Sequence, residues 1–489
     1  MAAAPAPLPA YGRGYAGFGS FQTDESVEAM MAVPAEAYAP PRRAVATADL
    51  LDAGAPPPAA LGAALRGCFL LDPAWTFLNH GAFGGASRLA LRAAQRWAEH
   101  AEAQPLRFID RELFPLLCHS VRCLAALVRA PPACVALVPN ATYALASIIA
   151  SAPLPQGAVL FCLDIGYGSV KLMLQAAAAR VGGSVVVGRV TFPLPGGPAQ
   201  LLAQVVPQIP AGCALAVFDA VTSNSGMVLP VAQLVAAARA AGAGAVLVDG
   251  AHSLGAFDLD LPALGADYFV SNCHKWLCSS RGLGMLYARQ PSGPGAPRPA
   301  VISHGYGAGF ASEFIWDGAR DYSAAVALPT LLEWWRWVGE ERARAYCRGL
   351  LVAALELLGR RWGVGTHVPL EFYSHMGCIQ LPAQCLPPGA LLPAAAGEPL
   401  FRCTATHSKM MQDALHHACA IEVPAKTLPG PLGGADSRTY LRISAFVYNS
   451  LADYERLAEA VLGISWEAGG VEGEPPRLVL AESAGRGEA

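Results

Sequence analysis

Short apolar runs alternate with longer segments of helical character between residues 133 and 289. The apolar runs predict strands at 133–138, 158–163, 184–187, 214–219, 245–249, 267–271 and 284–287. Between them, the segments 142–149, 169–179 and 231–241 have a pattern typical of helices. Continuous apolar strands separated by helices favour a mainly parallel sheet that is covered on both faces. The predicted fold class is therefore α/β.

The pattern changes after residue 325. A helix expected at 330–346 leads into a mixture of strands (378–381 and 439–444) and helices (407–419 and 451–461). This mixture predicts a smaller C-terminal α+β domain over residues 326–466, completed by the N-terminal part of the core, beside a large domain over residues 67–325. Residues 1–66 and 467–489 are of low complexity, and we expect both segments to be disordered.

The composition excludes some classes of protein. Hydrophobic residues make up 54% of the 489 residues, which is ample for a sizeable core. Lys and Arg total 34 against 37 Asp and Glu, and this balance argues against a nucleic-acid partner. No run of about 18 strongly apolar residues occurs, so we expect no membrane partner. Small molecules or other proteins remain as the expected partners.

The 13 cysteines are scattered and form no repeated CxxC pairs. An odd number without framework spacing favours reduced thiols, and we expect no metal site. The start of the chain lacks the features of a secretory signal, which predicts a cytoplasmic protein. Its Ala-, Pro- and Gly-rich composition leaves a plastid or mitochondrial transit peptide as the alternative.

Polar and titratable residues closely follow the ends of the expected strands. In open α/β sheets, ligands bind beyond the carboxyl ends of the strands. We therefore expect one edge of the sheet to gather Asn140, Ala141, Thr142, Tyr167, Ser223, Asp249, His252, Asn272, His274 and Lys275.

Asp249 and Lys275 together suit pyridoxal phosphate (PLP). A carboxylate beside the pyridine nitrogen keeps that nitrogen protonated, so that the ring accepts electrons. Partial burial of Lys275 would lower its pKa and favour a neutral amine that forms a Schiff base and then moves protons at the substrate Cα. Taken alone, Asp249 could simply cap a helix and Lys275 could be a solvated surface residue.

If Asp249 and Lys275 bind PLP, three further features of the sequence also suit that cofactor or its substrate. Asn140–Thr142 opens an expected helix whose N–H groups and hydroxyl would suit a phosphate, although a plain helix cap fits equally well. Tyr167, between two glycines, could lie on the face of the ring or be an ordinary loop aromatic. Arg442 could bind a carboxylate with its guanidinium fork, or could be an exposed strand residue.

Several motifs together resemble the class V aminotransferase-like enzymes of PLP fold type I. They are LNHGAFG (78–84), YGSVK (167–171), VTS (221–223), VDGAH (248–252), SNCHKW (271–276), DGARDYS (317–323) and RIS (442–444). Within this family the chain is most similar to the branch of isopenicillin N epimerases, plant-type L-cysteine desulfhydrases and hercynylcysteine sulfoxide lyases. The resemblance covers about residues 70–462. It implies a large domain built on a seven-stranded sheet and a smaller C-terminal domain.

The resemblance also implies roles for single residues. Lys275 would form the Schiff base and Asp249 would pair with the pyridine nitrogen, with His252 near the ring. Thr142, the Asn140–Thr142 backbone, Asn272 and His274 would hold the phosphate, while Tyr167 would stack on the ring and Ser223 would approach O3′. Arg442 would bind the substrate α-carboxylate, and Asn79 and His80 would line the substrate side. Members of the family are typically homodimers, and the stretches 303–306 and 318–321 are candidates for crossing into the partner site.

Two departures bear on the reaction. Ala319 stands where relatives often have Thr, so one phosphate contact would be missing. The stretch 425–439 has no cysteine, which argues against persulfide-forming desulfuration. The function that we expect is a C–S lyase acting on cysteine or a cysteine-derived amino acid. An amino-acid epimerase, an aminotransferase and a catalytically inactive family member remain as alternatives.

Overall fold

A computed structural model describes residues 25–51, 57–388, 390, 401–430, 432, 436–467 and 477–480. The expected strands form one seven-stranded sheet in the order β2-β8-β7-β6-β5-β3-β4. Strands β3 to β7 pair in parallel, and β8 lies antiparallel between β2 and β7. The predicted α/β fold with a mainly parallel sheet is confirmed. The strands are β2 (Val135–Val138), β3 (Val159–Leu163), β4 (Ser184–Gly188), β5 (Leu215–Asp219), β6 (Ala245–Asp249), β7 (Tyr268–Asn272) and β8 (Gly284–Ala288).

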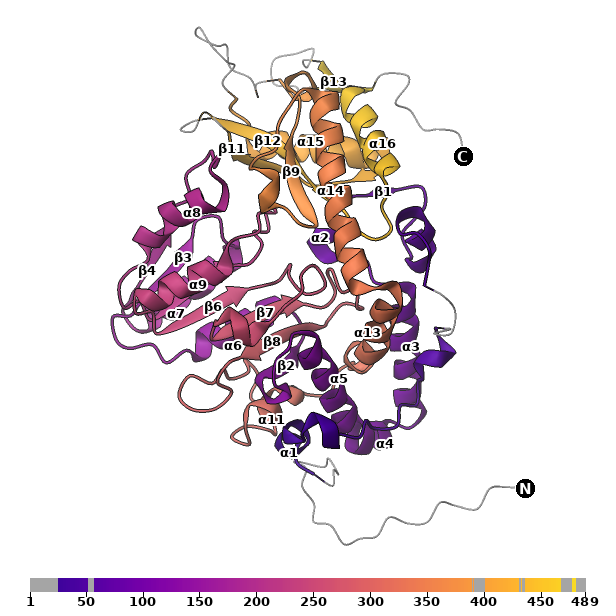
Figure 1. Ribbon diagram of the computed structural model, residues 1–489, viewed down its shortest axis with the longest axis vertical. Helices are drawn as coiled ribbons and strands as arrows, with labels where there is room; N and C mark the ends of the chain where they lie inside the picture. Colours follow the sequence, from indigo (N-terminus) through magenta and orange to yellow (C-terminus); the bar gives the residue numbers. More distant parts are fainter. Residues whose placement is uncertain are drawn as a thin grey trace, which may run out of the picture.

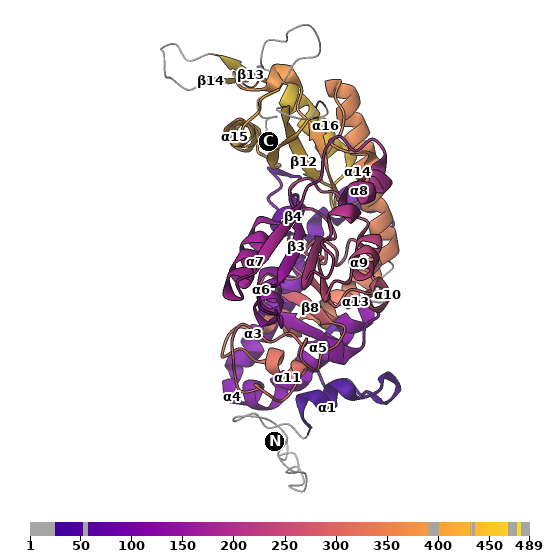
Figure 2. The same cartoon turned by 90° about the vertical axis from the view of Figure 1, so that its left-hand side faces the viewer.

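Alternate residues of each central strand point to opposite helical layers. In β3, Leu160 and Cys162 pack with α6 (Ala141–Ser151) and α7 (Gly168–Arg180), whereas Phe161 and Leu163 belong to the main core. Figure 2 shows α6 and α7 on one side of the sheet and α9 (Val231–Ala240), α10 (Leu261–Leu264) and α13 (Leu328–Val338) on the other. Burial on both faces explains why these strands read as continuous apolar runs.

The second part of the molecule lies above the sheet in Figure 1. Its antiparallel sheet has the order β11-β12-β9, built from β9 (Met376–Gln380), β11 (Ala425–Pro429) and β12 (Ser437–Ser444). Helices α15 (Ala405–Cys419) and α16 (Leu451–Leu462) pack with it. The N-terminal strand β1 (Thr76–Phe77) pairs in parallel with β10 (Ile421–Glu422), so an early segment of the chain joins this part.

The helix predicted at 330–346 is two helices. Helix α13 ends at Val338, and α14 runs from Glu340 to Trp362, well beyond the expected end. Gly339 lies between them with φ at 89°, a conformation that glycine adopts without steric cost. Gly339, followed by Glu340 and Glu341, is the signal in the sequence that marks this break.

Part of the N-terminal segment that was expected to be disordered packs on the fold. Helix α1 (Val27–Ala32) buries Val27 and Met31. Arg122 of α5 (Leu113–Leu127) donates hydrogen bonds to the backbone carbonyls of Met31 and Val33. These contacts give an Ala/Pro-rich segment enough buried surface and hydrogen bonding to dock. Disorder is also expected for residues 1–24 and 481–489, which lie outside the described ranges. Within the expected C-terminal tail, residues 477–480 form β14, which pairs with β13 (Ile464–Glu467).

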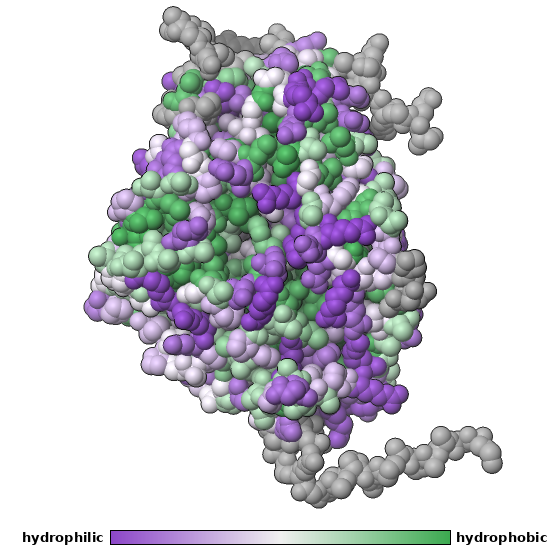
Figure 3. Space-filling model, in the orientation of Figure 1, coloured by the Kyte–Doolittle hydropathy of each residue, from purple (hydrophilic) through white to green (hydrophobic). Residues whose placement is uncertain are grey.

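The remaining helices are α2 (His80–Phe83), α3 (Arg88–Ala103), α4 (Pro105–Arg107), α8 (Gly197–Val205), α11 (Phe310–Ile315) and α12 (Ser323–Val326). No helix in the described ranges is long and apolar enough to cross a membrane. All cysteine thiols are free, and all but Cys68 and Cys123 are buried. Figure 3 shows polar and apolar residues interspersed over one face of the molecule.

Candidate active site

A pocket opens at the carboxyl ends of β5, β6 and β7. Each of these strands ends in a polar residue, namely Asp219, Asp249 and Asn272. The pocket therefore lies where parallel α/β sheets bind ligands. It is lined by Ala141, Thr142, Leu145, Tyr167, Asp219, Val221, Ser223, Asp249, Ala251, His252, Asn272 and Lys275.

Lys275 stands on the loop that follows β7. Its Nζ lies 3.2 Å from Nε2 of His252. Burial lowers the pKa of the Lys275 amine to about 8; the charge of Asp249 opposes this shift, and that of Arg442 adds to it. On the order of a tenth of the amine is therefore neutral at pH 7, far more than for an ordinary lysine, and imine chemistry requires this neutral form.

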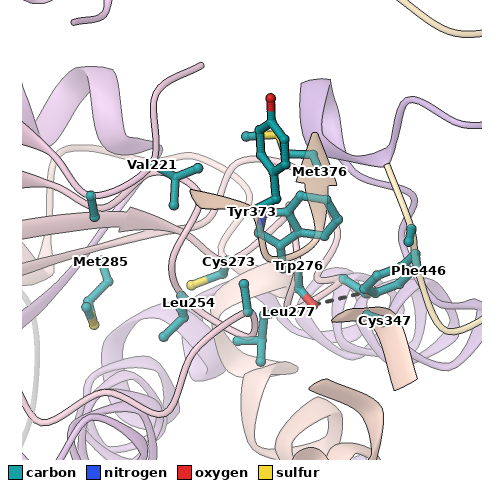
Figure 4. Packing of buried hydrophobic residues seen from close by; sticks show 14 of the residues in the cluster. Val221, Leu254, Cys273, Trp276, Leu277, Met285, Cys347, Tyr373, Met376 and Phe446 are labelled. Carbon is teal, nitrogen blue, oxygen red and sulfur yellow. Dashed lines mark hydrogen bonds between the residues drawn. The ribbon is translucent and has the colours of Figure 1, made fainter. Parts of the chain in front are cut away.

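The backbone around Lys275 is held from both sides. Nε2 of His80 lies 3.0 Å from the Lys275 carbonyl, and Gly84 packs so tightly that a Cβ there would collide with the His274 carbonyl. The next residues, Trp276 and Leu277, are buried in the apolar core (Figure 4). Rigid packing behind the loop thus fixes where the amine projects.

Two carboxyl groups lie side by side at the floor of the pocket. Asp219 and Asp249 are register partners on β5 and β6 and are both buried. Burial raises the pKa of both groups, and the charge of Asp249 adds to the increase for Asp219. Hydrogen bonds oppose these shifts, since Asp219 accepts one from the Tyr167 N–H (3.2 Å) and Asp249 one from the Ala251 N–H (3.0 Å).

Asp219 was not among the predicted site residues. The available signal was its position, because it ends an apolar strand as Asp249 does. In the sequence, Asp219 simply ends its apolar run, and the polar residues Thr222 and Ser223 follow shortly after it. The pairing of β5 with β6 brings the two aspartates together, and that pairing was not known from the sequence.

His252 carries a nitrogen with no protein partner. Its Nε2 faces Lys275, whereas Nδ1 is buried and has no hydrogen-bond partner among the described residues. Burial holds the pKa of the imidazole well below its usual value, and the charges of Lys275 and Arg442 contribute. The ring is therefore neutral at pH 7 and presents an unsatisfied polar atom beside the pocket.

The N-terminus of α6 forms another wall. Asn140 caps the helix by accepting a hydrogen bond from the Tyr143 N–H (2.9 Å), and Asn272 accepts one from the Ala141 N–H (2.9 Å). Ala141, Thr142 and Asn272 line the pocket, but Asn140 does not. The helix cap and a phosphate-binding helix end, which were alternatives in the sequence, are thus compatible.

His80 and His274 also lie outside the pocket lining. His80 is fully buried, with Nδ1 2.9 Å from the Tyr448 hydroxyl and its ring stacked on Phe446 at 3.7 Å between centroids. Nδ1 of His274 lies 3.3 Å from the Leu283 carbonyl. Both histidines contact protein groups around the lysine loop.

Arg442 reaches the site from β12. The residue is 4% exposed, and Nη1 donates to the carbonyl of Ser223, a residue of the pocket lining. Nη2 donates to Oδ1 of Asn79 (3.1 Å). Nε is buried and has no partner in the part of the chain that the structure describes. Burial lowers the pKa of the guanidinium from a very high value.

The turn with Ala319 takes no part in this pocket. Arg320 pairs with Asp317 (2.6 Å) and lies over the Tyr322 ring at 4.1 Å. Tyr306, in the other stretch expected to cross into a partner, is 56% exposed.

The donor set fits PLP. One pocket is surrounded by four groups that suit this cofactor. They are the partly neutral Lys275 amine, the buried Asp249 carboxyl group, the N-terminus of α6, and the neutral His252 ring, whose Nδ1 has no hydrogen-bond partner among the described residues. No group of three or more metal-ligating side chains occurs in the described residues. Fold and site together define an α/β protein whose pocket suits a carbonyl cofactor held by a lysine amine.

Comparisons with known proteins agree with this class. The aminotransferase class-V family model matches residues 122–361. A protein of Arabidopsis thaliana named "Probable L-cysteine desulfhydrase, chloroplastic" is 30% identical over 412 residues, covering 80% of this chain and 83% of the relative. Isopenicillin N epimerase of Amycolatopsis lactamdurans is 30% identical over 415 residues, covering 81% and 96%.

Among solved structures, the cystine C-S lyase C-DES aligns with a TM-score of 0.63 at 19% identity, covering 79% of this chain and 97% of that one. This likeness concerns the fold. The chain belongs to the class V aminotransferase family and is a PLP-dependent enzyme of that family.

Proposed function

We propose that this protein is a C–S lyase that acts on cysteine or a small cysteine-derived amino acid. The observation that carries the proposal is the 3.2 Å contact between Lys275 Nζ and His252 Nε2. The Lys275 amine, which is the candidate acid–base group, and the His252 ring therefore lie on one side of the pocket. Elimination needs proton transfer at Cα on one face only, whereas inversion needs delivery to the opposite face.

The pocket residues have roles that suit the cofactor. Asp249 would hold the pyridine nitrogen protonated, and Thr142 at the start of α6 would hold the phosphate together with Asn272. Tyr167 would lie on the ring and Ser223 near O3′. When bound, PLP supplies an electron sink conjugated with the substrate amino group.

The chain's own groups then act on the substrate. Arg442 offers its free Nε–H and remaining Nη–H groups to the α-carboxylate. The neutral amine of Lys275 takes the proton from Cα, and as an ammonium it returns a proton to the departing sulfur. Loss of the Cβ–S bond and addition of water yield pyruvate, ammonia and the sulfur fragment, which is hydrogen sulfide from cysteine and a sulfenic acid from a cysteine sulfoxide.

Four plant proteins named as L-cysteine desulfhydrases, three of them as probable or putative, are 28–31% identical to the chain. These relatives support a small cysteine-derived substrate.

The test is a pyruvate assay on the purified protein with L-cysteine and with a cysteine sulfoxide. Pyruvate and hydrogen sulfide are expected in equal amounts from L-cysteine, and pyruvate with a sulfenic acid from the sulfoxide. Lys275→Ala is expected to form none of these products. Absence of pyruvate from every such substrate would refute the lyase proposal.

An amino-acid epimerase is the second candidate, because isopenicillin N epimerases match over 96–98% of their length. Solvent deuterium entering Cα with loss of optical purity, and without pyruvate, would select it.

We also propose that the protein is a homodimer. Phe83 and Ile302 are 72% and 69% exposed, and a second copy of the chain would cover them. Light scattering in solution tests this directly, and a monomer at micromolar concentration would contradict it.

A further inference from the structure

Four polar side chains form a continuous row from the surface to Arg442. His416 Nδ1 lies 3.0 Å from Glu422 Oε2, and Asn79 Nδ2 donates to Glu422 Oε1 (3.0 Å). Arg442 Nη2 then donates to Asn79 Oδ1 (3.1 Å). The row begins at a side chain that is 40% exposed and ends at an arginine that is 4% exposed.

The chemistry of the row fixes the orientation of the Asn79 amide. A carboxylate accepts hydrogen bonds only, so Glu422 must face the NH₂ group of Asn79. The amide oxygen is then turned toward the guanidinium, which can only donate. Without Glu422, the Asn79 NH₂ group would lose its acceptor in the row, and the contact with Arg442 alone would orient the amide.

The backbone holds the members of the row together. The Leu78 N–H donates to the Glu422 carbonyl (2.9 Å), and the Arg442 N–H donates to the Pro424 carbonyl (2.9 Å). Strands β1, β10 and β12 thus bring Asn79, Glu422 and Arg442 together from distant parts of the sequence. His416, on α15, contacts Glu422 from the outer side.

The row leaves the guanidinium ready for a ligand. Nη1 and Nη2 each use one donor on Ser223 and Asn79, while Nε finds no acceptor among the described residues. A guanidinium has five N–H donors, and the free ones can receive a carboxylate. The direction in which they point depends on the two acceptors that clamp Arg442.

We propose that Glu422 is a positioning residue for recognition of the substrate α-carboxylate, acting through Asn79, with His416 holding Glu422 from the surface. The proposal rests on the proposed function only in that Arg442 binds an amino-acid carboxylate. It does not depend on which bond is broken afterwards.

The experiment titrates the holoenzyme with L-alanine and with ethylamine, the corresponding amine that lacks the carboxylate, and follows the absorbance of the bound cofactor. Glu422→Ala is expected to weaken L-alanine binding about tenfold, the typical effect of losing one charge-assisted hydrogen bond. Ethylamine binding and the spectrum without ligand should not change.

A double-mutant cycle tests the route through Asn79. In the Asn79→Ala background, Glu422→Ala should weaken L-alanine binding by less than about twofold further, because the side chain that links Glu422 to Arg442 is already absent. Glu112→Ala is the matched control, since it removes a similar pair (His100 Nε2 to Glu112 Oε2, 2.6 Å) elsewhere on the surface.

Equal weakening of both ligands, or independent effects of the two substitutions, would overturn the proposal. If Glu422→Ala fails to fold, His416→Ala probes the same row from the surface and should weaken L-alanine binding about threefold; no selective loss there would also overturn it. Because binding is read by absorbance, the result is independent of whether pyruvate is formed.

Discussion

The amine of Lys275 and Nε2 of His252 lie 3.2 Å apart at the end of the parallel sheet. His252 is neutral at pH 7, since burial holds its pKa well below the usual value. A neutral partner does not stabilise an ammonium as a carboxylate would. Protonation of Lys275 is therefore governed mainly by burial, which disfavours the charged form, and by Asp249, which favours it.

Uptake of PLP by the cofactor-free protein should follow the neutral fraction of Lys275. We expect the rate to rise with pH and to reach its midpoint near pH 8 rather than near the ordinary lysine value of 10.5. Asp249→Asn should move the midpoint to lower pH, because it removes the anion that raises the pKa. Absorbance of the bound cofactor over a pH series measures both midpoints. A midpoint above pH 10, or a shift to higher pH in the variant, would contradict this account.

Asp219 should destabilise the cofactor-free protein when it ionises. Its folded-state pKa is raised by burial and by the charge of Asp249, so the folded protein loses stability as the pH rises through that pKa. Asp219→Asn keeps an oxygen for the Tyr167 N–H and removes the charge. We expect its melting temperature to exceed that of the wild type by about 1–2 °C at pH 8 and by less at pH 5. A variant that is less stable at pH 8 would refute the assignment.

Local patterns in the sequence were sufficient to predict the central sheet. Strands that are buried on both faces appear as apolar runs. The polar residues that follow these runs predict Asp249, His252, Asn272 and Lys275 as site residues. Arg442 donates a hydrogen bond to Ser223 of the pocket lining, and its burial differs from the usual exposure of a strand arginine.

Features that depend on pairing between distant segments were not visible. Strand β1 has two residues, too few for any periodicity, yet its pairing with β10 places Asn79 against Glu422. Asp219 becomes a site residue only because β5 lies beside β6. The role of His80 was expected from its neighbours in the motif, but its contacts are set by Tyr448 and Phe446, far along the chain.

His80 should matter for stability more than for substrate binding. Replacing it by Leu would leave the Tyr448 hydroxyl and the Lys275 carbonyl without their buried partner. We expect His80→Leu to lower the free energy of unfolding by about 2–4 kcal/mol, with little change in KM. Urea unfolding and steady-state kinetics separate the two effects, and Asn79→Ala serves for comparison because it should raise KM. A rise in KM for His80→Leu at unchanged stability would contradict this prediction and would support a role of His80 in substrate binding.

Gly84 should be intolerant of any side chain because it is packed against the lysine loop. Its φ is 69°, and a Cβ would collide with the carbonyl of His274. Gly84→Ala should cost at least about 2 kcal/mol, from the unfavourable backbone conformation and the clash together. Relief of the clash would displace Lys275, so PLP uptake should also slow. Gly85→Ala is the matched control, because a Cβ there meets its nearest neighbour, Leu71 Cδ2, at an ordinary 3.7 Å. Equal stability and equal PLP uptake in the two variants would show that the backbone of the Lys275 loop is not held by Gly84.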